Sequence, residues 1–288
     1  KSVPKPQGLR FGSAFRTITK RIESGYYERL GVTALELMPV LAQGWRKAKG
    51  SGAGLVRPPW GYQAMSWYAV NGDYGTADEL VALIDAAHRH GLAVLADVSL
   101  EHGYGGKHNG LVTDLWPKWR VAKPKNPWGL LEIDLEAKGA RRFVVGGLRR
   151  LLVDFGFDGL RLDWTEKVPT KTWKAVVAEV RRFAPKAILI SENPTLPLLT
   201  EARMDGTWDF FFHWEAPLLL RRVYRNWDGF AGRLVDTQAK LVENLRGRAY
   251  PPHGARTVAG IDPRKGPPVV RYIESHDLPR IARRRVKW

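Results

Sequence analysis

The stretch YGTADELVALIDAAHRHGLAVLADV, residues 74–98, decides the fold, because it carries one helix and one buried strand in direct succession. Thr76 followed by Glu79 has the pattern of a capping box, and Gly91 is expected to end the helix. Residues 93–98 form a short apolar run, which is typical of a buried strand. A helix that leads directly into such a strand is the repeating unit of an α/β protein with a parallel sheet.

The same alternation recurs along the chain and predicts a (β/α)8 barrel-like fold of the TIM type. The prediction is one catalytic barrel domain over residues 1–288, with the long loop at 99–136 as a small subdomain. Only eleven residues follow residue 277, so we expect an incomplete barrel without an eighth strand or a C-terminal β-domain. The further elements expected are strands at 35–40, 159–163, 188–192, 209–213 and 269–273, a weaker strand at 9–12, and helices near 17–30, 138–154, 171–183 and 231–246.

The composition is that of a globular chain of 288 residues, with 44% hydrophobic residues and no cysteine. The missing cysteines exclude disulfides, cysteine-ligated zinc, iron–sulfur clusters and thiol catalysis. No apolar run approaches the roughly 18 residues of a membrane span, and the first residues lack a signal-peptide pattern. We therefore expect no membrane partner and a cytoplasmic protein, with secretion as the alternative.

The net charge of +17, from 46 Lys and Arg against 29 Asp and Glu, raises the question of nucleic-acid binding. The basic residues are spread along helical segments, where they alternate with apolar residues, and no known nucleic-acid motif accompanies them. We expect no specific nucleic-acid partner.

Polar residues gather where the predicted strands end. In a β/α barrel the carboxyl ends of all strands open on one face, so these residues are expected to converge there. The carboxylates among them suggest glycoside chemistry, in which one carboxylate attacks the anomeric carbon and another protonates the leaving oxygen. The residues are Asp97, His102, Arg161, Asp163, Glu192, His276 and Asp277.

The strings ADVSLEH, GFDGLRLDW, ISEN and YIESHD, in that order, resemble the four motif regions of the α-amylase superfamily, glycoside hydrolase family 13. LGVTALELMPV is similar to the segment around the second barrel strand, and WGYQ precedes a segment similar to the third β/α unit. Within the superfamily, GYQ and ESHD most resemble 1,4-α-glucan branching enzymes.

The resemblance implies that Asp163 is the nucleophile, Glu192 the general acid/base and Asp277 the carboxylate that stabilises the transition state. Arg161 precedes Asp163 by two residues on the same strand, so it is expected to point to the same side and to pair with its carboxylate. The remaining candidate substrate-binding residues are Tyr62, Asp97, His102 and His276, with Trp60 and Trp164 as stacking platforms.

Two departures from the family pattern bear on metals and on the subfamily. Glu101 stands where many amylases have an Asn that binds calcium, so we expect no cofactor and doubt a structural calcium, with a cation on Glu101 as the alternative. Asn193 and Pro194 replace the acidic residue that many branching enzymes carry after the catalytic Glu.

These observations predict a retaining enzyme that cleaves α-1,4-glucosidic bonds in starch, glycogen or maltooligosaccharides and transfers the glucan to form α-1,6 branches. The alternatives are an α-amylase-type hydrolase and an inactive barrel that binds glucan or nucleic acid. An incomplete barrel leaves strand edges that a loop or another chain must cover, so a homo-oligomer is a further expectation.

Overall fold

The structure is a computed structural model that describes residues 13–44, 46–47, 55–56, 60–104, 119, 121, 130–193, 196–209 and 269–271. The chain divides into two compact units. The first unit comprises Lys1–Asp163 and Ala175–Leu189, and the second comprises Trp164–Lys174 and Ile190–Trp288.

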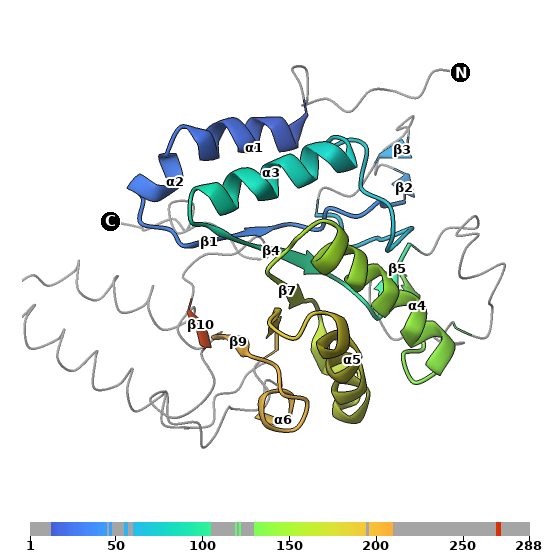
Figure 1. The fold of residues 1–288 in the computed structure, drawn as a ribbon. Helices are drawn as coiled ribbons and strands as arrows, with labels where there is room; N and C mark the ends of the chain where they lie inside the picture. Colours follow the sequence, from blue (N-terminus) through green and yellow to red (C-terminus); the bar gives the residue numbers. More distant parts are fainter. Residues whose placement is uncertain are drawn as a thin grey trace, which may run out of the picture. The chain divides into compact units, whose positions relative to one another are not determined.

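The sheet of the first unit consists of parallel strands that alternate with helices along the chain (Figure 1). The order of hydrogen-bonded strands is β1, β4, β7 and then β8, whose first residues belong to this unit. Leu37 pairs with Ala96, and Asp97 of β4 pairs with Arg161 of β7. These strands are β1 (Ala34–Leu37), β4 (Ala93–Val98), β7 (Gly159–Leu162) and β8 (Ile188–Ser191).

The helix α3 (Ala77–Arg89) confirms the pattern from which its position was predicted. Thr76 accepts a hydrogen bond from the Glu79 backbone N–H, and the Glu79 carboxylate accepts one from the Thr76 N–H, which completes the capping box. Gly91 follows in the left-handed region at φ +68°. The apolar residues that recur at helical spacing in this segment form a buried apolar stripe: Leu80, Leu83, Ile84 and Ala87.

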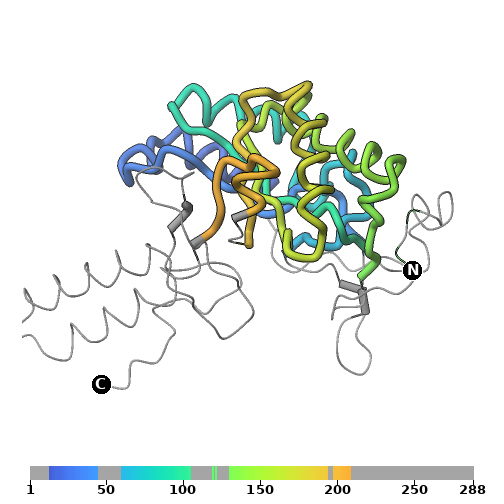
Figure 2. Tube along the Cα trace, turned by 90° about the horizontal axis from the view of Figure 1, so that it is seen from below, coloured from blue at the N-terminus to red at the C-terminus, as the bar shows by residue number. Residues whose placement is uncertain are grey.

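The helix predicted near 17–30 is two helices, α1 (Ala14–Glu23) and α2 (Tyr26–Arg29). Gly25 separates them at φ +67°, a conformation that glycine adopts at little cost. Helix α1 packs side by side with α3, as Figures 1 and 2 both show. The Arg16 side chain of α1 reaches the Glu79 carboxylate at 2.5 Å, so the cap of α3 is also a contact between the helices.

The helix predicted over 138–154 is present as α4 (Lys138–Arg149), which continues into a π-helical turn at Arg150–Asp154. The helix predicted over 171–183 is α5 (Thr170–Phe183). Two short antiparallel pairs accompany the main strands: β2 (Arg46–Lys47) with β3 (Leu55–Val56), and β5 (His102–Gly103) with β6 (Leu131–Glu132).

The second unit contains a parallel run of strands in the order β8, β9 and β10. A 3-10 turn at Thr165–Lys167 follows β7, and the short helix α6 (Leu196–Thr200) lies between β8 and β9 in sequence. The two further strands are β9 (Gly206–Asp209) and β10 (Val269–Arg271).

The predicted α/β class and its strands are largely confirmed. The strand at 93–98 matches residue for residue, whereas β1 ends before Pro39, which has no N–H to donate. The strand predicted at 209–213 begins where the described part of β9 ends, at Asp209, and β9 starts earlier than predicted, at Gly206. The strand at 9–12, the helix at 231–246 and residues 210–213 and 272–273 lie outside the described residues.

The described residues contain no closed barrel. They also contain no helix with the length and apolar character needed to cross a membrane.

Candidate active site

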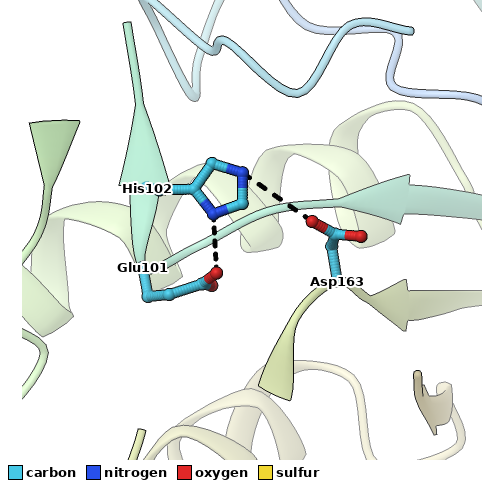
Figure 3. A group of neighbouring side chains, drawn as sticks. All are labelled: Glu101, His102 and Asp163. Atoms are coloured by element: carbon cyan, nitrogen blue, oxygen red, sulfur yellow. Dashed lines mark hydrogen bonds and ion pairs between the residues drawn. The ribbon is translucent and has the colours of Figure 1, made fainter. Parts of the chain in front are cut away.

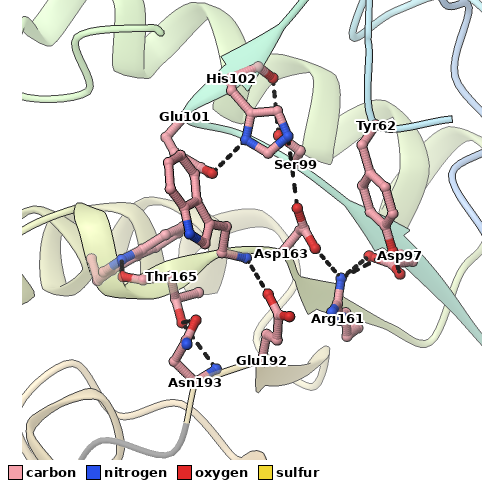
Figure 4. Close-up of polar contacts among 12 residues, drawn as sticks. Tyr62, Asp97, Ser99, Glu101, His102, Arg161, Asp163, Thr165, Glu192 and Asn193 are labelled. Carbon is pink, nitrogen blue, oxygen red and sulfur yellow. Dashed lines mark hydrogen bonds and ion pairs between the residues drawn. The ribbon is translucent and has the colours of Figure 1, made fainter. Parts of the chain in front are cut away.

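A buried guanidinium lies at the carboxyl end of the first unit's sheet. Arg161 is fully buried on β7, and its Nη1 donates to Asp97 Oδ1 at 2.8 Å and to Asp163 Oδ1 at 2.5 Å (Figure 4). Asp97 is 2% exposed and Asp163 is 9% exposed. The predicted pairing of Arg161 with Asp163 is confirmed, and the parallel register of β4 and β7 explains why Asp97 joins them.

Tyr62 completes this network from a loop that precedes α3 in the chain. Its hydroxyl donates to Asp97 Oδ2 at 2.5 Å and accepts from Arg161 Nη1 at 3.2 Å. Burial raises the pKa of the Tyr62 phenol, and the negative charge of Asp97 raises it further. The phenol therefore keeps its proton and acts as a donor to Asp97.

His102 approaches Asp163 from β5, as the sequence led us to expect (Figure 3). Its Nε2 lies 3.7 Å from Asp163 Oδ2, and its Nδ1 lies 2.6 Å from Glu101 Oε1. The backbone is anchored on both sides, since the Ser99 hydroxyl donates to the His102 carbonyl at 2.9 Å and the Ile133 N–H donates to the Glu101 carbonyl at 2.7 Å.

Glu101, His102 and Asp163 form a group whose ligand atoms lie within 4.8 Å of one another, as in many metal sites. The 2.6 Å between Glu101 Oε1 and His102 Nδ1 is a hydrogen-bond distance. Two ligands on one tetrahedral ion with bonds of about 2.0–2.2 Å lie about 3.3 Å apart. We therefore assign the contact to a hydrogen bond rather than to two ligands of one metal ion.

In the second unit, Glu192 lies directly after β8 and is held by backbone. The Trp164 N–H donates to Glu192 Oε2 at 2.6 Å. Trp164 has a φ of 47°, which is rare for a bulky residue and costs about 1–3 kcal/mol. This conformation directs the N–H of the residue that follows Asp163 to the candidate acid/base.

Hydrogen bonds between Thr165 and Asn193 connect the same two segments of the second unit, the turn that begins at Thr165 and the residues that follow β8. The Thr165 hydroxyl donates to Asn193 Oδ1 at 3.3 Å and accepts from the Asn193 N–H at 3.4 Å. The Trp173 indole N–H donates to the Thr165 carbonyl at 2.9 Å. Glu192 thus follows a strand whose end is tied to the turn after Trp164 (Figure 4).

Three further predicted site residues are Trp60, His276 and Asp277. Trp60 is 46% exposed, two residues before Tyr62. His276 and Asp277 lie outside the described residues, so their roles stay predictions.

The sequence analysis did not single out Glu36, an acidic residue on β1. Loss of hydration raises its pKa to about 7, the charge of Asp97 raises it as well, and Arg161 acts in the opposite direction. The residue as a whole is exposed and the charges of Asp97 and Arg161 act in opposite directions, so the raised pKa depends on the hydration that the carboxyl group itself loses. The signal in the sequence was a carboxylate inside the apolar run LELMPV.

Comparison with protein-family models matches residues 13–109 to the alpha amylase catalytic domain. Malto-oligosyltrehalose trehalohydrolase from Deinococcus radiodurans is 32% identical over an alignment of 231 residues, and the match covers 78% of this chain and 36% of that protein. The enzyme of the same name from Saccharolobus solfataricus is 26% identical over 91% of this chain and 46% of its own length. The 1,4-alpha-glucan branching enzyme GlgB of Mycolicibacterium paratuberculosis is 31% identical over 54% of this chain and 20% of its own.

Among solved structures, a maltogenic alpha-amylase, AmyB from Thermotoga neapolitana, superposes with a TM-score of 0.66 at 22% identity. The match covers 93% of this chain and 56% of that one. An alpha-amylase from Geobacillus thermoleovorans superposes with a TM-score of 0.60 at 21% identity, over 75% of this chain and 49% of that one.

These matches confirm the resemblance to the α-amylase superfamily and the (β/α)8 barrel class of the fold. The relatives include branching enzymes, as the motifs indicated, and also trehalohydrolases. The chain spans between a fifth and a half of the length of these curated relatives.

Proposed function

We propose that the chain cleaves α-1,4-glucosidic bonds in α-glucans with retention of configuration, with Asp163 as nucleophile and Glu192 as general acid/base. The observation that carries the proposal is the buried contact of Asp163 with Arg161 at 2.5 Å. An adjacent cation favours the ionised carboxylate, which is the form that attacks an anomeric carbon.

The proposed reaction has two displacements. In the first, a carboxylate oxygen of Asp163 forms a bond to the anomeric carbon, the bond to the leaving oxygen breaks, and Glu192 gives that oxygen its proton. In the second, Glu192 takes a proton from the incoming hydroxyl, whose oxygen attacks the anomeric carbon and releases Asp163. The Trp164 N–H holds Glu192 Oε2, so we assign the transferred proton to Oε1.

Tyr62, Asp97, His102 and Arg161 are proposed to bind the sugar and to hold Asp163 in place. The motif resemblance adds His276 as a sugar ligand and Asp277 as the carboxylate that stabilises the transition state, and it adds Trp60 and Trp164 as stacking surfaces. No cofactor is needed for this chemistry.

The fate of the covalent intermediate separates two candidate functions. Transfer to a sugar 6-hydroxyl, which forms α-1,6 branches, is supported by the GYQ and ESHD strings and by the branching-enzyme relatives. Transfer to water is favoured by a different observation, since the two relatives that match 78% and 91% of the chain are named trehalohydrolases.

The test is to incubate the protein with amylose, then to treat the product with an α-1,6-specific debranching enzyme and count reducing ends before and after. New ends that appear only after debranching support branch formation. Ends that rise from the start, with none added by debranching, support hydrolysis. No change in either measurement, with correctly folded protein, contradicts the proposed cleavage.

A further inference from the structure

Glu101 is a buried carboxylate that touches His102, its neighbour in the sequence. The two residues are 3% and 2% exposed, and Glu101 Oε1 lies 2.6 Å from His102 Nδ1. Within the part of the chain that the structure describes, the other oxygen of Glu101, Oε2, is buried and has no hydrogen-bond partner. Burying an unsatisfied polar group costs about 1–3 kcal/mol, and more for a charged one. The contact that this buried carboxylate does make is with His102 Nδ1.

The backbone on both sides of the imidazole ring is fixed independently of Glu101's side chain. His102 Nδ1 faces the carboxylate, and the Ser99 and Ile133 hydrogen bonds hold the carbonyls of His102 and Glu101. What the backbone leaves undetermined is the orientation of the ring and the nitrogen that carries the proton. An ionised carboxylate only accepts hydrogen bonds, so Glu101 requires a proton on Nδ1.

The opposite ring nitrogen then faces the candidate nucleophile. His102 Nε2 lies 3.7 Å from Asp163 Oδ2, while Asp163 Oδ1 is bound by Arg161 (Figures 3 and 4). The imidazole of His102 thus lies between the buried carboxylate of Glu101 and the candidate nucleophile Asp163. In such arrangements the carboxylate sets the tautomer and orientation of the ring.

We propose that Glu101 is a positioning residue that fixes His102 with Nδ1 protonated, so that Nε2 is directed to Asp163 and to the sugar bound there. Glu101 acts through the ring, because the side-chain contact that it makes is with His102 Nδ1. This inference rests on the proposed function for its catalytic part, whereas its structural part concerns the imidazole alone.

Two measurements on Glu101→Gln test the proposal. The first is the 15N NMR spectrum of the imidazoles, with the His102 signals identified by their loss in His102→Gln. Glutamine keeps the volume but loses the charge, so we expect the His102 ring to lose its fixed protonated Nδ1 and to populate the Nε2-protonated tautomer. The second is kcat with maltooligosaccharide, expected to fall at least tenfold with KM changed less than threefold.

Three variants serve as comparisons. Glu101→Asp keeps a carboxylate and should restore part of the NMR signature and of kcat. Glu28→Gln is the matched control, because Glu28 Oε1 also contacts a histidine Nδ1, that of His90, at 2.9 Å on the surface. It should change neither kcat nor the His102 signals. In a His102→Gln background, Glu101→Gln should cost no further activity, since residues that act through one another are not additive.

The proposal is overturned if Glu101→Gln leaves the His102 nitrogen signals unchanged, or if its loss of kcat is as large without His102 as with it. It is also overturned if EDTA reproduces the loss in the wild type and calcium restores it, because Glu101 would then be a cation ligand. Failure of the proposed function gives a different result, in which Asp163→Asn retains turnover while the NMR signature still depends on Glu101.

Discussion

At Arg161 one nitrogen atom, Nη1, donates to the oxygens of Asp97, Asp163 and Tyr62 in a fully buried environment. Removing one partner of a buried ion pair leaves charge without compensation and typically costs 3–5 kcal/mol. We expect Arg161→Met to lower the free energy of unfolding by about 3–5 kcal/mol in urea titrations and to abolish glucan cleavage. The control is Arg89→Met, whose exposed pair with Glu23 spans 3.9 Å and should change stability by less than about 1 kcal/mol. Equal losses in the two variants would contradict the role of the buried network.

Glu36 leads to a prediction about pH. Its pKa is about 7 in the folded protein and 4.5 as a free side chain, so the folded state binds more protons between these values. The raised pKa of Glu36 therefore contributes to the free energy of unfolding below pH 4.5, and this contribution is lost as the pH rises through 7. We expect Glu36→Gln to raise the urea midpoint relative to the wild type at pH 8 and to leave it nearly unchanged at pH 4.5. A midpoint raised equally at both pH values would show that the carboxylate does not titrate in this way.

Residue contacts were predictable where strand geometry alone determines them. Arg161 and Asp163 lie two residues apart, so they share a side of the chain, and the predicted contact is present. The hydrogen bond from Tyr62 to Asp97 joins residues 35 positions apart and depends on the path of a loop, which no local pattern specifies. The contact of Glu101 with His102 was missed for another reason: neighbouring residues of a strand normally point to opposite faces, whereas Glu101 lies just before β5 and contacts the first residue of that strand.

At the scale of single elements, the capping box of α3 couples helix formation to helix packing. Thr76 caps the N-terminus, and Glu79 both completes the box and pairs with Arg16 of α1. We expect Thr76→Ala to lower the free energy of unfolding by about 1 kcal/mol, with a range of 0.5–2. The measurement is urea unfolding, and Thr17→Ala, an exposed site inside α1, is the control expected to stay within about 0.5 kcal/mol. A larger effect at Thr17 than at Thr76 would contradict the prediction.

Elements with strong local signals were predicted well, and those set by tertiary context were not. The capping box, the apolar stripe and Gly91 specify α3 without reference to the rest of the chain. The break between α1 and α2 depends on Gly25, a residue that sequence patterns tolerate within a helix at moderate cost. The start of β9 was missed because its residues, GTWD, are less apolar than typical strand residues, and pairing with β8 places them in the sheet.

For the whole molecule, the proposed mechanism requires a carboxylate from each compact unit, since Asp163 ends a segment of the first and Glu192 lies in the second. Within the second unit, Trp164, the residue that follows Asp163 in the chain, donates its backbone N–H to Glu192. The two carboxylates also have separable tasks in the proposed chemistry. A substrate whose leaving group needs no proton should therefore reveal one task without the other.

We predict that Glu192→Gln, given α-maltosyl fluoride, forms a covalent maltosyl ester on Asp163 that accumulates. Fluoride departs without a proton, so the first displacement proceeds, whereas the second lacks the base that activates water. Intact-protein mass spectrometry should show one added maltosyl group, and peptide mapping should place it on Asp163. Azide, a nucleophile that needs no base, should release the ester and restore turnover. Asp163→Asn keeps the shape of the site but cannot form the ester, so it should show no adduct under the same conditions. An adduct on another residue, or fluoride release by Asp163→Asn at the rate of the Glu192 variant, would remove Asp163 as the nucleophile.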